Sequence, residues 1–135
     1  MLTKADIHHV IDVLELRDKP HMIYMGGSLC IRGIRDTNDI DLAVDGEDFK
    51  EICKRYGKEN EITCPLIDRK IDLEIDGIKV ELFERTSPLF INEADEIDGL
   101  LCQKINEIIN MKRRFNREKD KKDIELLKSL GYKAQ

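Results

Sequence analysis

The sequence predicts an α/β protein of the α+β kind, in which a small mixed β-sheet carries helices packed on one face and further helices follow at the C-terminal end. Three observations predict this fold class. Residues 39–44 alternate between apolar and polar side chains, as a half-buried strand does, and residues 71–84 form two such runs around an Asp-Gly pair. Segments near both ends of the chain repeat their apolar residues at the spacing of an amphipathic helix.

A chain of 135 residues has the usual length of one domain. We therefore predict a single domain over residues 1–135, with a catalytic sheet core over about residues 1–86 and a helical part over about residues 87–135. The hydrophobic share of 41% and the charged share of 38% are typical of a globular protein with a strongly solvated surface.

The first elements lead into a glycine turn. Thr3 and Asp6 are spaced as a helix N-cap and its acidic third position, and they predict an opening helix that runs to Leu14. Residues 21–25 are typical of a short buried strand, which continues directly into Gly26 and Gly27. We expect Ser28 to cap a short helix that extends through residue 34.

The next strand places two acidic side chains on one face of the sheet. In residues 39–44, Asp39 and Asp41 share a face with Ala43, while the apolar residues between them point the other way. Residues 45–58 then have a helical pattern, and residues 62–67 favour another strand despite Pro65.

The Asp76-Gly77 pair predicts a two-residue hairpin turn and with it the register of the two flanking strands. Ile75 is then opposite Ile78, and Asp72 is opposite Glu81, so one face of the hairpin is apolar and the other is charged. After this hairpin the sequence predicts a long helix over residues 94–115 and a shorter one over residues 119–130, ended by Gly131.

Composition indicates where the protein is located in the cell and argues against some classes of protein. No apolar run approaches the length of a membrane span, and the N-terminal residues lack the apolar stretch of a signal peptide, so we expect a cytoplasmic protein with no membrane contact. The cysteines form no CxxC pair, which argues against a zinc ribbon or a redox dithiol. The formal net charge is -5, yet residues 104–122 hold eight basic and only three acidic side chains.

Two motifs carry chemistry. A Gly-Gly-Ser turn lets backbone amides approach a phosphate, and the start of the following helix adds partial positive charge, so Gly26, Gly27 and Ser28 are candidates for binding a polyphosphate. Asp39 and Asp41 lie two residues apart on one strand face, where they can share Mg²⁺ or Mn²⁺ with substrate phosphates. Either motif alone has a plainer interpretation, as an ordinary turn or a solvated edge strand, and only their order together favours a metal site.

The hairpin offers a third carboxylate. Glu81 and Asp72 are cross-strand neighbours in the predicted register, and either can complete the metal site. We favour Glu81, because it lies among the apolar residues of a strand centre, where an unpaired carboxylate costs free energy. Asp72, in contrast, is next to a charged and exposed cluster.

The combined motifs resemble the polymerase-β-type nucleotidyltransferase superfamily, and in particular its minimal members, which include the AbiEii-like toxins. The matching segments are Gly26-Gly27-Ser28, Asp39-Ile40-Asp41-Leu42, Val80-Glu81-Leu82, Lys104, and Lys119-Asp120-Lys121-Lys122-Asp123-Ile124. The resemblance implies a nucleotidyltransferase fold, two metal ions on the three acidic residues, and a triphosphate held by Gly27, Ser28 and Lys104. It also implies that Asp123 orients nearby basic groups.

The resemblance implies a metal-dependent enzyme that transfers a nucleotide from ATP or another nucleoside triphosphate to a hydroxyl acceptor and releases pyrophosphate. The acceptor stays open between RNA or tRNA, a protein and a small molecule, as does a role in a toxin–antitoxin pair, in resistance or with a partner protein. The low aromatic content of 5% argues against a single-stranded nucleic acid as the acceptor, because few aromatic side chains are present for its bases to stack on. The alternatives are a catalytically inactive nucleotide- or partner-binding module of the same fold and an unrelated structural α/β protein.

Overall fold

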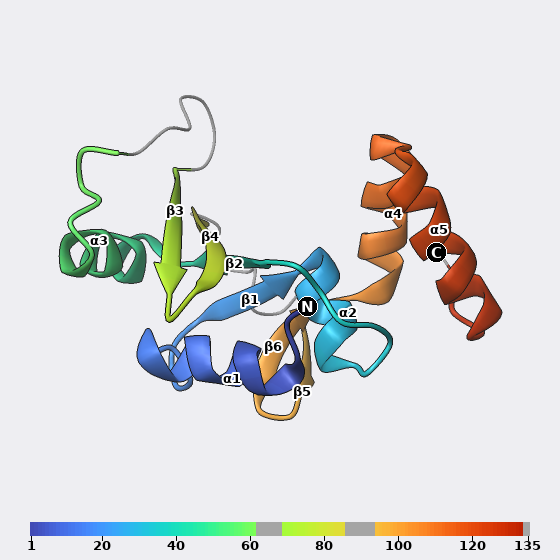
Figure 1. Ribbon diagram of the computed structural model, residues 1–135, viewed down its shortest axis with the longest axis horizontal. Coiled ribbons are helices and arrows are strands. Elements are labelled where there is room, and N and C mark those ends of the chain that lie inside the picture. Colours follow the sequence, from blue (N-terminus) through green and yellow to red (C-terminus); the bar gives the residue numbers. More distant parts are fainter. Residues whose placement is uncertain (62–68, 86–93, 134–135) are drawn as a thin grey trace.

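A mixed β-sheet forms the centre of the computed structural model, which describes residues 1–61, 69–85 and 94–133 (Figure 1). The described strands are β1 (His21–Tyr24), β2 (Ile40–Val44), β3 (Lys70–Ile75), β4 (Ile78–Glu84), β5 (Ala94–Ile97) and β6 (Leu100–Gln103). Their order across the sheet is β3-β4-β2-β1-β6-β5. The pairs β2·β4 and β1·β6 are parallel and the others are antiparallel. The predicted α+β class and mixed sheet are confirmed.

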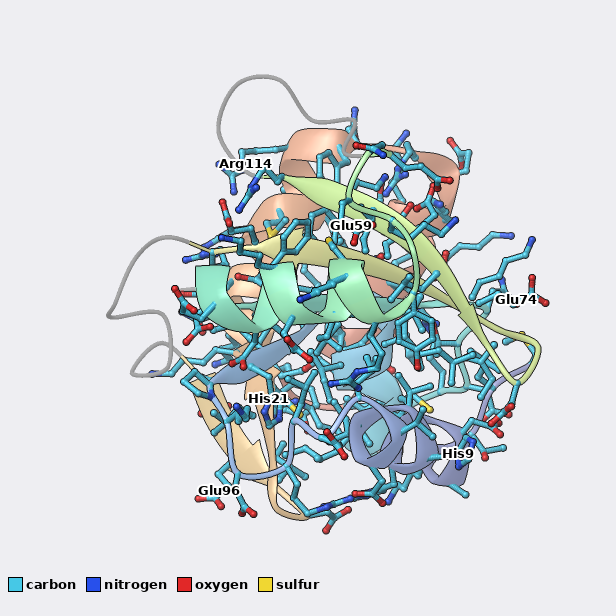
Figure 2. All side chains as sticks on the ribbon, turned by 90° about the vertical axis from the view of Figure 1, so that its left-hand side faces the viewer. His9, His21, Glu59, Glu74, Glu96 and Arg114 are labelled. Atoms are coloured by element: carbon cyan, nitrogen blue, oxygen red, sulfur yellow. The ribbon has the colours of Figure 1, made fainter. Side chains whose placement is uncertain are left out.

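The described helices are α1 (Lys4–Val13), α2 (Met25–Ile31), α3 (Gly46–Arg55), α4 (Ile105–Phe115) and α5 (Glu118–Ser129). Side chains of α1 and α3 pack with the apolar face of the sheet in one large core. A second, smaller core joins Leu29 of α2 to α4 and α5. The pair α4–α5 therefore lies at the opposite end of the molecule from α3, and Figure 2, viewed from the α3 end, has this pair at the back.

Several elements around the apolar core were predicted correctly from local sequence patterns. Asp6 accepts a hydrogen bond of 2.8 Å from the backbone N–H of Thr3, which completes the start of α1. On β2, Ile40, Leu42 and Val44 are all fully buried, as the alternation predicts. Helices α3 and α5 lie within the predicted segments to within a few residues.

The β3–β4 hairpin has the predicted register. Ile75 pairs with Ile78, and Asp72 pairs with Glu81. Asp76 and Gly77 both have positive φ, 49° and 83°, as a two-residue turn of this kind requires. Figure 2 shows Glu74 at the outer edge of this hairpin, projecting away from the molecule, so the charged face of the hairpin is open.

The long helix predicted from residue 94 was wrong in its first ten residues. Residues 94–103 form the hairpin β5–β6, with Asp98 and Gly99 at its turn and φ values of 52° and 78°. Leu100 and Cys102 are fully buried, because β6 pairs with β1 and becomes part of the sheet. The helical part of the chain therefore begins with α4 and not near residue 87.

The prediction that Ser28 caps the short helix was also wrong. Helix α2 begins at Met25, with Tyr24 at its N-cap, so Ser28 lies inside the helix and is fully buried. The helix ends at Ile31, before the predicted residue 34. The strand predicted over residues 62–67 lies outside the described residues. In the described part of the chain, every helix is too short or too polar to cross a membrane.

Candidate functional site

A cleft of about 820 Å³ opens over the face of the sheet opposite α1 and α3. One wall is the sheet itself, where Asp41, Ala43 and Glu81 alternate with the buried core residues of β2 and β4. The other wall is formed by α4 and α5 and carries Met111, Lys112, Phe115, Arg117, Lys119, Lys122 and Asp123. The cleft therefore lies between an acidic strand face and a largely basic helical wall.

The acidic wall places two carboxyl groups side by side. Asp41 and Glu81 are register partners on the parallel strands β2 and β4, and Asp39 lies just before β2. The pKa of Asp41 is raised to about 7. The largest cause is burial, followed by the hydrogen bond with Glu81, and the negative charges of Glu81 and Asp39 add to the shift. Its oxygen Oδ1 is buried and has no hydrogen-bond partner among the described residues.

Glu81 has a cation beside it. The ammonium of Lys70 on the edge strand β3 donates a hydrogen bond of 3.1 Å to Oε1 of Glu81. The hydrogen bond with Asp41, together with Lys70, holds the pKa of Glu81 below its ordinary value. The charge of Glu81 is thus partly compensated within the chain.

On the basic wall, the acidic side chains are fully compensated. Arg35 donates two hydrogen bonds, both of 2.9 Å, to the two oxygens of Asp123. Lys112, only 4% exposed, lies 2.8 Å from Asp123 and 3.3 Å from Asp120. Burial raises the pKa of Asp123, but Arg35 and Lys112 outweigh that effect and hold it below its ordinary value.

Two solved structures share this architecture. One is the "putative nucleotidyltransferase" TM1012 from Thermotoga maritima, with a TM-score of 0.64 and 16% identity over 92% of this chain and 93% of that one. The other is JHP933 from Helicobacter pylori, with a TM-score of 0.57 and 18% identity over 92% of this chain and 65% of that one. The chain has a nucleotidyltransferase-like fold. No protein-family model and no curated protein matches the sequence.

The nucleotidyltransferase-like fold brings five of the predicted site residues to one cleft, namely Gly26, Asp39, Asp41, Glu81 and Asp123. Gly27, Ser28 and Lys104 are described by the structure but are not among the residues that line it. The hydroxyl of Ser28 instead donates a hydrogen bond of 2.8 Å to the carbonyl oxygen of Gln103.

Both glycines of the turn are required by close packing. A Cβ on Gly26 would lie 2.6 Å from the hydroxyl of Thr37 and 3.3 Å from the Arg35 guanidinium, on the cleft side. A Cβ on Gly27 would lie 2.7 Å from a methyl group of Ile23, on the core side. Gly26 lines the cleft and Gly27 does not, so Gly26 is the glycine whose backbone a ligand in the cleft can approach.

Sequence reasoning gave no site role to three cations that line the cleft, namely Arg35, which follows α2, and Lys112 and Arg117 of the helical wall. Lys112 had a signal, since it continues the apolar spacing of Ile105, Ile108 and Ile109 along α4. A lysine at such a position is buried and needs a carboxylate partner. Arg35 had no local signal, because its partner Asp123 lies 88 residues away in the sequence.

The acidic wall suits a divalent cation that is shared with a substrate. Mg²⁺ is usually held by one or two carboxylates together with substrate phosphates and water. Asp41, with its unpartnered buried oxygen, and Asp39 supply two such carboxylates. Among the described residues, no three His, Cys, Asp or Glu side chains are grouped so as to hold a metal ion without further ligands. The site is therefore open on the side of the cleft.

Proposed function

We propose that this protein is a metal-dependent nucleotidyltransferase, which transfers a nucleotide from a nucleoside triphosphate to a hydroxyl acceptor and releases pyrophosphate. The observation that carries the proposal is the charge arrangement of the cleft. Asp39 and Asp41 lie on one wall, and Lys119 and Lys122 are among the basic groups of the other. A magnesium–triphosphate complex has the complementary pattern, with a cation for the carboxylates and phosphate oxygens for the lysines.

Each residue then has a role set by its position. Asp39 and Asp41 hold Mg²⁺ or Mn²⁺, with the unpartnered oxygen of Asp41 as the deepest ligand. Glu81 is the third acidic group, facing the acceptor hydroxyl once Lys70 releases it. When bound, the metal supplies charge neutralisation at the phosphates and acidifies the attacking hydroxyl.

The other predicted residues support the site indirectly. Ser28 bonds to the carbonyl of Gln103, whose side chain accepts a hydrogen bond of 3.0 Å from the backbone N–H of Met25. Met25 has a φ of 51°, so these bonds hold a strained turn directly before Gly26. Asp123 fixes Arg35 and Lys112 against the cleft. Lys104, at the N-cap of α4, stays a prediction as a phosphate contact.

The test is transfer of label from each α-phosphate-labelled nucleoside triphosphate, with Mg²⁺ or Mn²⁺, to separate RNA, protein and small-molecule fractions. Asp39→Asn removes the label transfer if the proposal holds. Asp72→Asn is the matched control, since Asp72 lies on the same charged face beside Glu81. Transfer that survives in Asp39→Asn contradicts the proposed site. The labelled fraction also decides between an RNA-directed toxin of the AbiEii type, a protein-modifying enzyme and a resistance enzyme.

A second candidate is a catalytically inactive nucleotide- or partner-binding module of the same fold. The ion pair between Lys70 and Glu81 favours it, because a third metal ligand that is already paired leaves the site incomplete. This candidate predicts nucleotide binding that is insensitive to Mg²⁺ and no labelled product in any fraction. Binding that needs Mg²⁺ and disappears in Asp39→Asn argues for the enzyme instead.

A further inference from the structure

Phe115 is an exposed aromatic residue on the wall of the cleft. It is the last residue of α4 and 52% of it is exposed. Among the described residues, the other exposed large apolar side chains are Met1 and Leu130, and neither lines the cleft. A single exposed apolar side chain is common on a protein surface, so the position of Phe115 matters more than its exposure.

The surroundings of Phe115 are those of a stacking site. The guanidinium of Arg117 lies 5.0 Å from the centre of its ring. Met111 precedes Phe115 by one helical turn, lies on the same side of α4 and also lines the cleft. Together they form an apolar surface next to a cation, a combination that binds a flat, electron-rich ring through stacking and cation–π attraction.

The two aromatic residues on the opposite wall also have cations over their rings, so exposure and position, and not the cation, set Phe115 apart from them. Arg85 lies 5.9 Å from the ring centre of Tyr24, and Lys70 lies 5.8 Å from that of Phe83. Both are half-buried on the sheet, beside the carboxylates. Phe115 is the more exposed ring, and it lies on the helical wall with the lysines that we assign to the phosphates.

We infer that Phe115, flanked by Met111 and Arg117, is the platform on which the base of the nucleoside triphosphate stacks. The inference rests on the proposed function, which places the phosphates between Asp39 and the lysines of α5. It adds the third part of the ligand, a planar base next to the polyanion. Stacking of this kind contributes through the face of the ring, so it favours nucleotides over inorganic polyphosphates and accepts more than one base.

The experiment compares the four ribonucleoside triphosphates with inorganic tripolyphosphate, each titrated calorimetrically in the presence of Mg²⁺. Phe115→Ala weakens binding of the best nucleotide roughly tenfold or more and leaves tripolyphosphate binding unchanged. Leu130→Ala is the matched control, because Leu130 is 54% exposed and lies outside the cleft. It leaves both affinities at the wild-type value.

A second variant reports on the contact itself. The sequence contains no tryptophan, so Phe115→Trp introduces a single indole at the platform. Its fluorescence is quenched by the nucleotide and not by tripolyphosphate, and its nucleotide affinity equals or exceeds that of the wild type. This readout responds to stacking and not to a general change in stability.

Each other outcome overturns the inference in its own way. If wild type and Phe115→Ala bind nucleotide equally, the proposed function stands and the platform is wrong. If Phe115→Ala weakens tripolyphosphate as much as nucleotide, Phe115 acts on the basic wall and not on a base. If nucleotide binding is intact and only transfer to an acceptor falls, Phe115 contacts the acceptor. If the wild type binds neither ligand, the proposed function fails and the platform fails with it.

Discussion

Asp41 on the sheet and Asp120 on α5 each have a buried carboxylate oxygen, but the pKa values of the two side chains shift in opposite directions. Burial, with Glu81 and Asp39 nearby, raises the pKa of Asp41 to about 7. Asp120 is fully buried, whereas Asp41 is half-buried, yet hydrogen bonds from Arg117 and then Lys112 lower the pKa of Asp120 to about 2. Burial therefore does not decide the direction of the shift, whereas the presence of a cation does. The buried acids of the helical wall contact cations directly, whereas on the acidic wall Lys70 pairs with Glu81 and the Oδ1 atom of Asp41 has no hydrogen-bond partner among the described residues.

The lysines of the two walls differ in the same way. Lys112 is 4% exposed and contacts two buried carboxylates. The side chain of Lys70 is 32% exposed and contacts Glu81, which is itself 38% exposed. An ion pair shielded from water is costly to break, and an ion pair in water contributes little. Lys112 thus belongs to the framework, and under the proposed function Lys70 is the cation that we expect a metal ion to displace.

The largest effect should come from Asp41→Asn. We expect the variant to lose nucleotide transfer completely, because the amide removes the charge of the proposed metal ligand while keeping its size. Its melting temperature without metal should equal or exceed that of the wild type, since the repulsion from Asp39 and Glu81 is relieved. Transfer assays and thermal unfolding check the two halves separately. A variant that is inactive and also unfolded would say nothing for a catalytic role and would contradict the predicted stability.

The second largest effect should come from Lys112→Met on the helical wall. We expect the free energy of unfolding to fall by about 3 kcal/mol, because Asp120 and Asp123 stay buried while losing a cation. Urea unfolding measures this change. Lys121→Met is the control, since Lys121 pairs with Glu118 on the open surface, and we expect it to change stability by less than about 0.5 kcal/mol. Equal effects of the two substitutions would show that the buried cluster is not structural.

The third prediction concerns pH. In the metal-free protein, folded Asp41 keeps its proton up to a pKa of about 7, whereas in the unfolded chain it loses the proton near its ordinary value of 3.8. Between these values the folded state binds more protons, so the contribution of Asp41 to stability falls as the pH rises towards 7. His21 acts with the opposite sign, because burial lowers its pKa, but it is present in both wild type and Asp41→Asn.

We therefore expect the melting temperature of Asp41→Asn, minus that of the wild type, to increase between about pH 5 and about pH 8 in the presence of a chelator. Asp120 does not contribute in this window, because its pKa is low both folded and unfolded. Thermal unfolding of both proteins across the pH series measures the difference. A difference that is constant with pH would show that Asp41 is already ionised and compensated.

Elements set by local rules were predictable from the sequence. The Asp-Gly turn determined the β3–β4 register, and the period of two determined that Asp39 and Asp41 share the cleft. The same rule was available for Asp98 and Gly99, but the acidic residues around that pair also suit a helix. Residues 100–103 form a strand because they pair with the much earlier β1. Such pairing between distant segments leaves no signal in the local sequence.

The candidate site also has one part that local sequence patterns predict and one part that depends on contacts between distant residues. Its acidic wall could be predicted, because Asp41 and Glu81 lie on strands whose faces follow from alternation, and Asp39 directly precedes one of these strands. The basic wall depends on where two helices fold back, and the Arg35–Asp123 contact joins residues 88 apart. Ser28 shows the converse case. The helix begins four residues earlier than predicted, with Tyr24 and not Ser28 at its N-cap, so the Ser28 side chain lies in the interior.

The smallest effect on stability, and the sharpest test of the comparison, should come from Lys70→Met. We expect the free energy of unfolding to change by less than about 1 kcal/mol, because the Lys70–Glu81 pair is partly exposed. Metal affinity should rise, since Glu81 is released and a positive charge next to Asp41 is removed. Titration with Mn²⁺, followed by thermal unfolding of wild type and variant, measures both quantities. If Lys70→Met destabilises the protein as strongly as Lys112→Met, then Lys70 is a fixed part of the acidic wall, and a metal ion does not take its place.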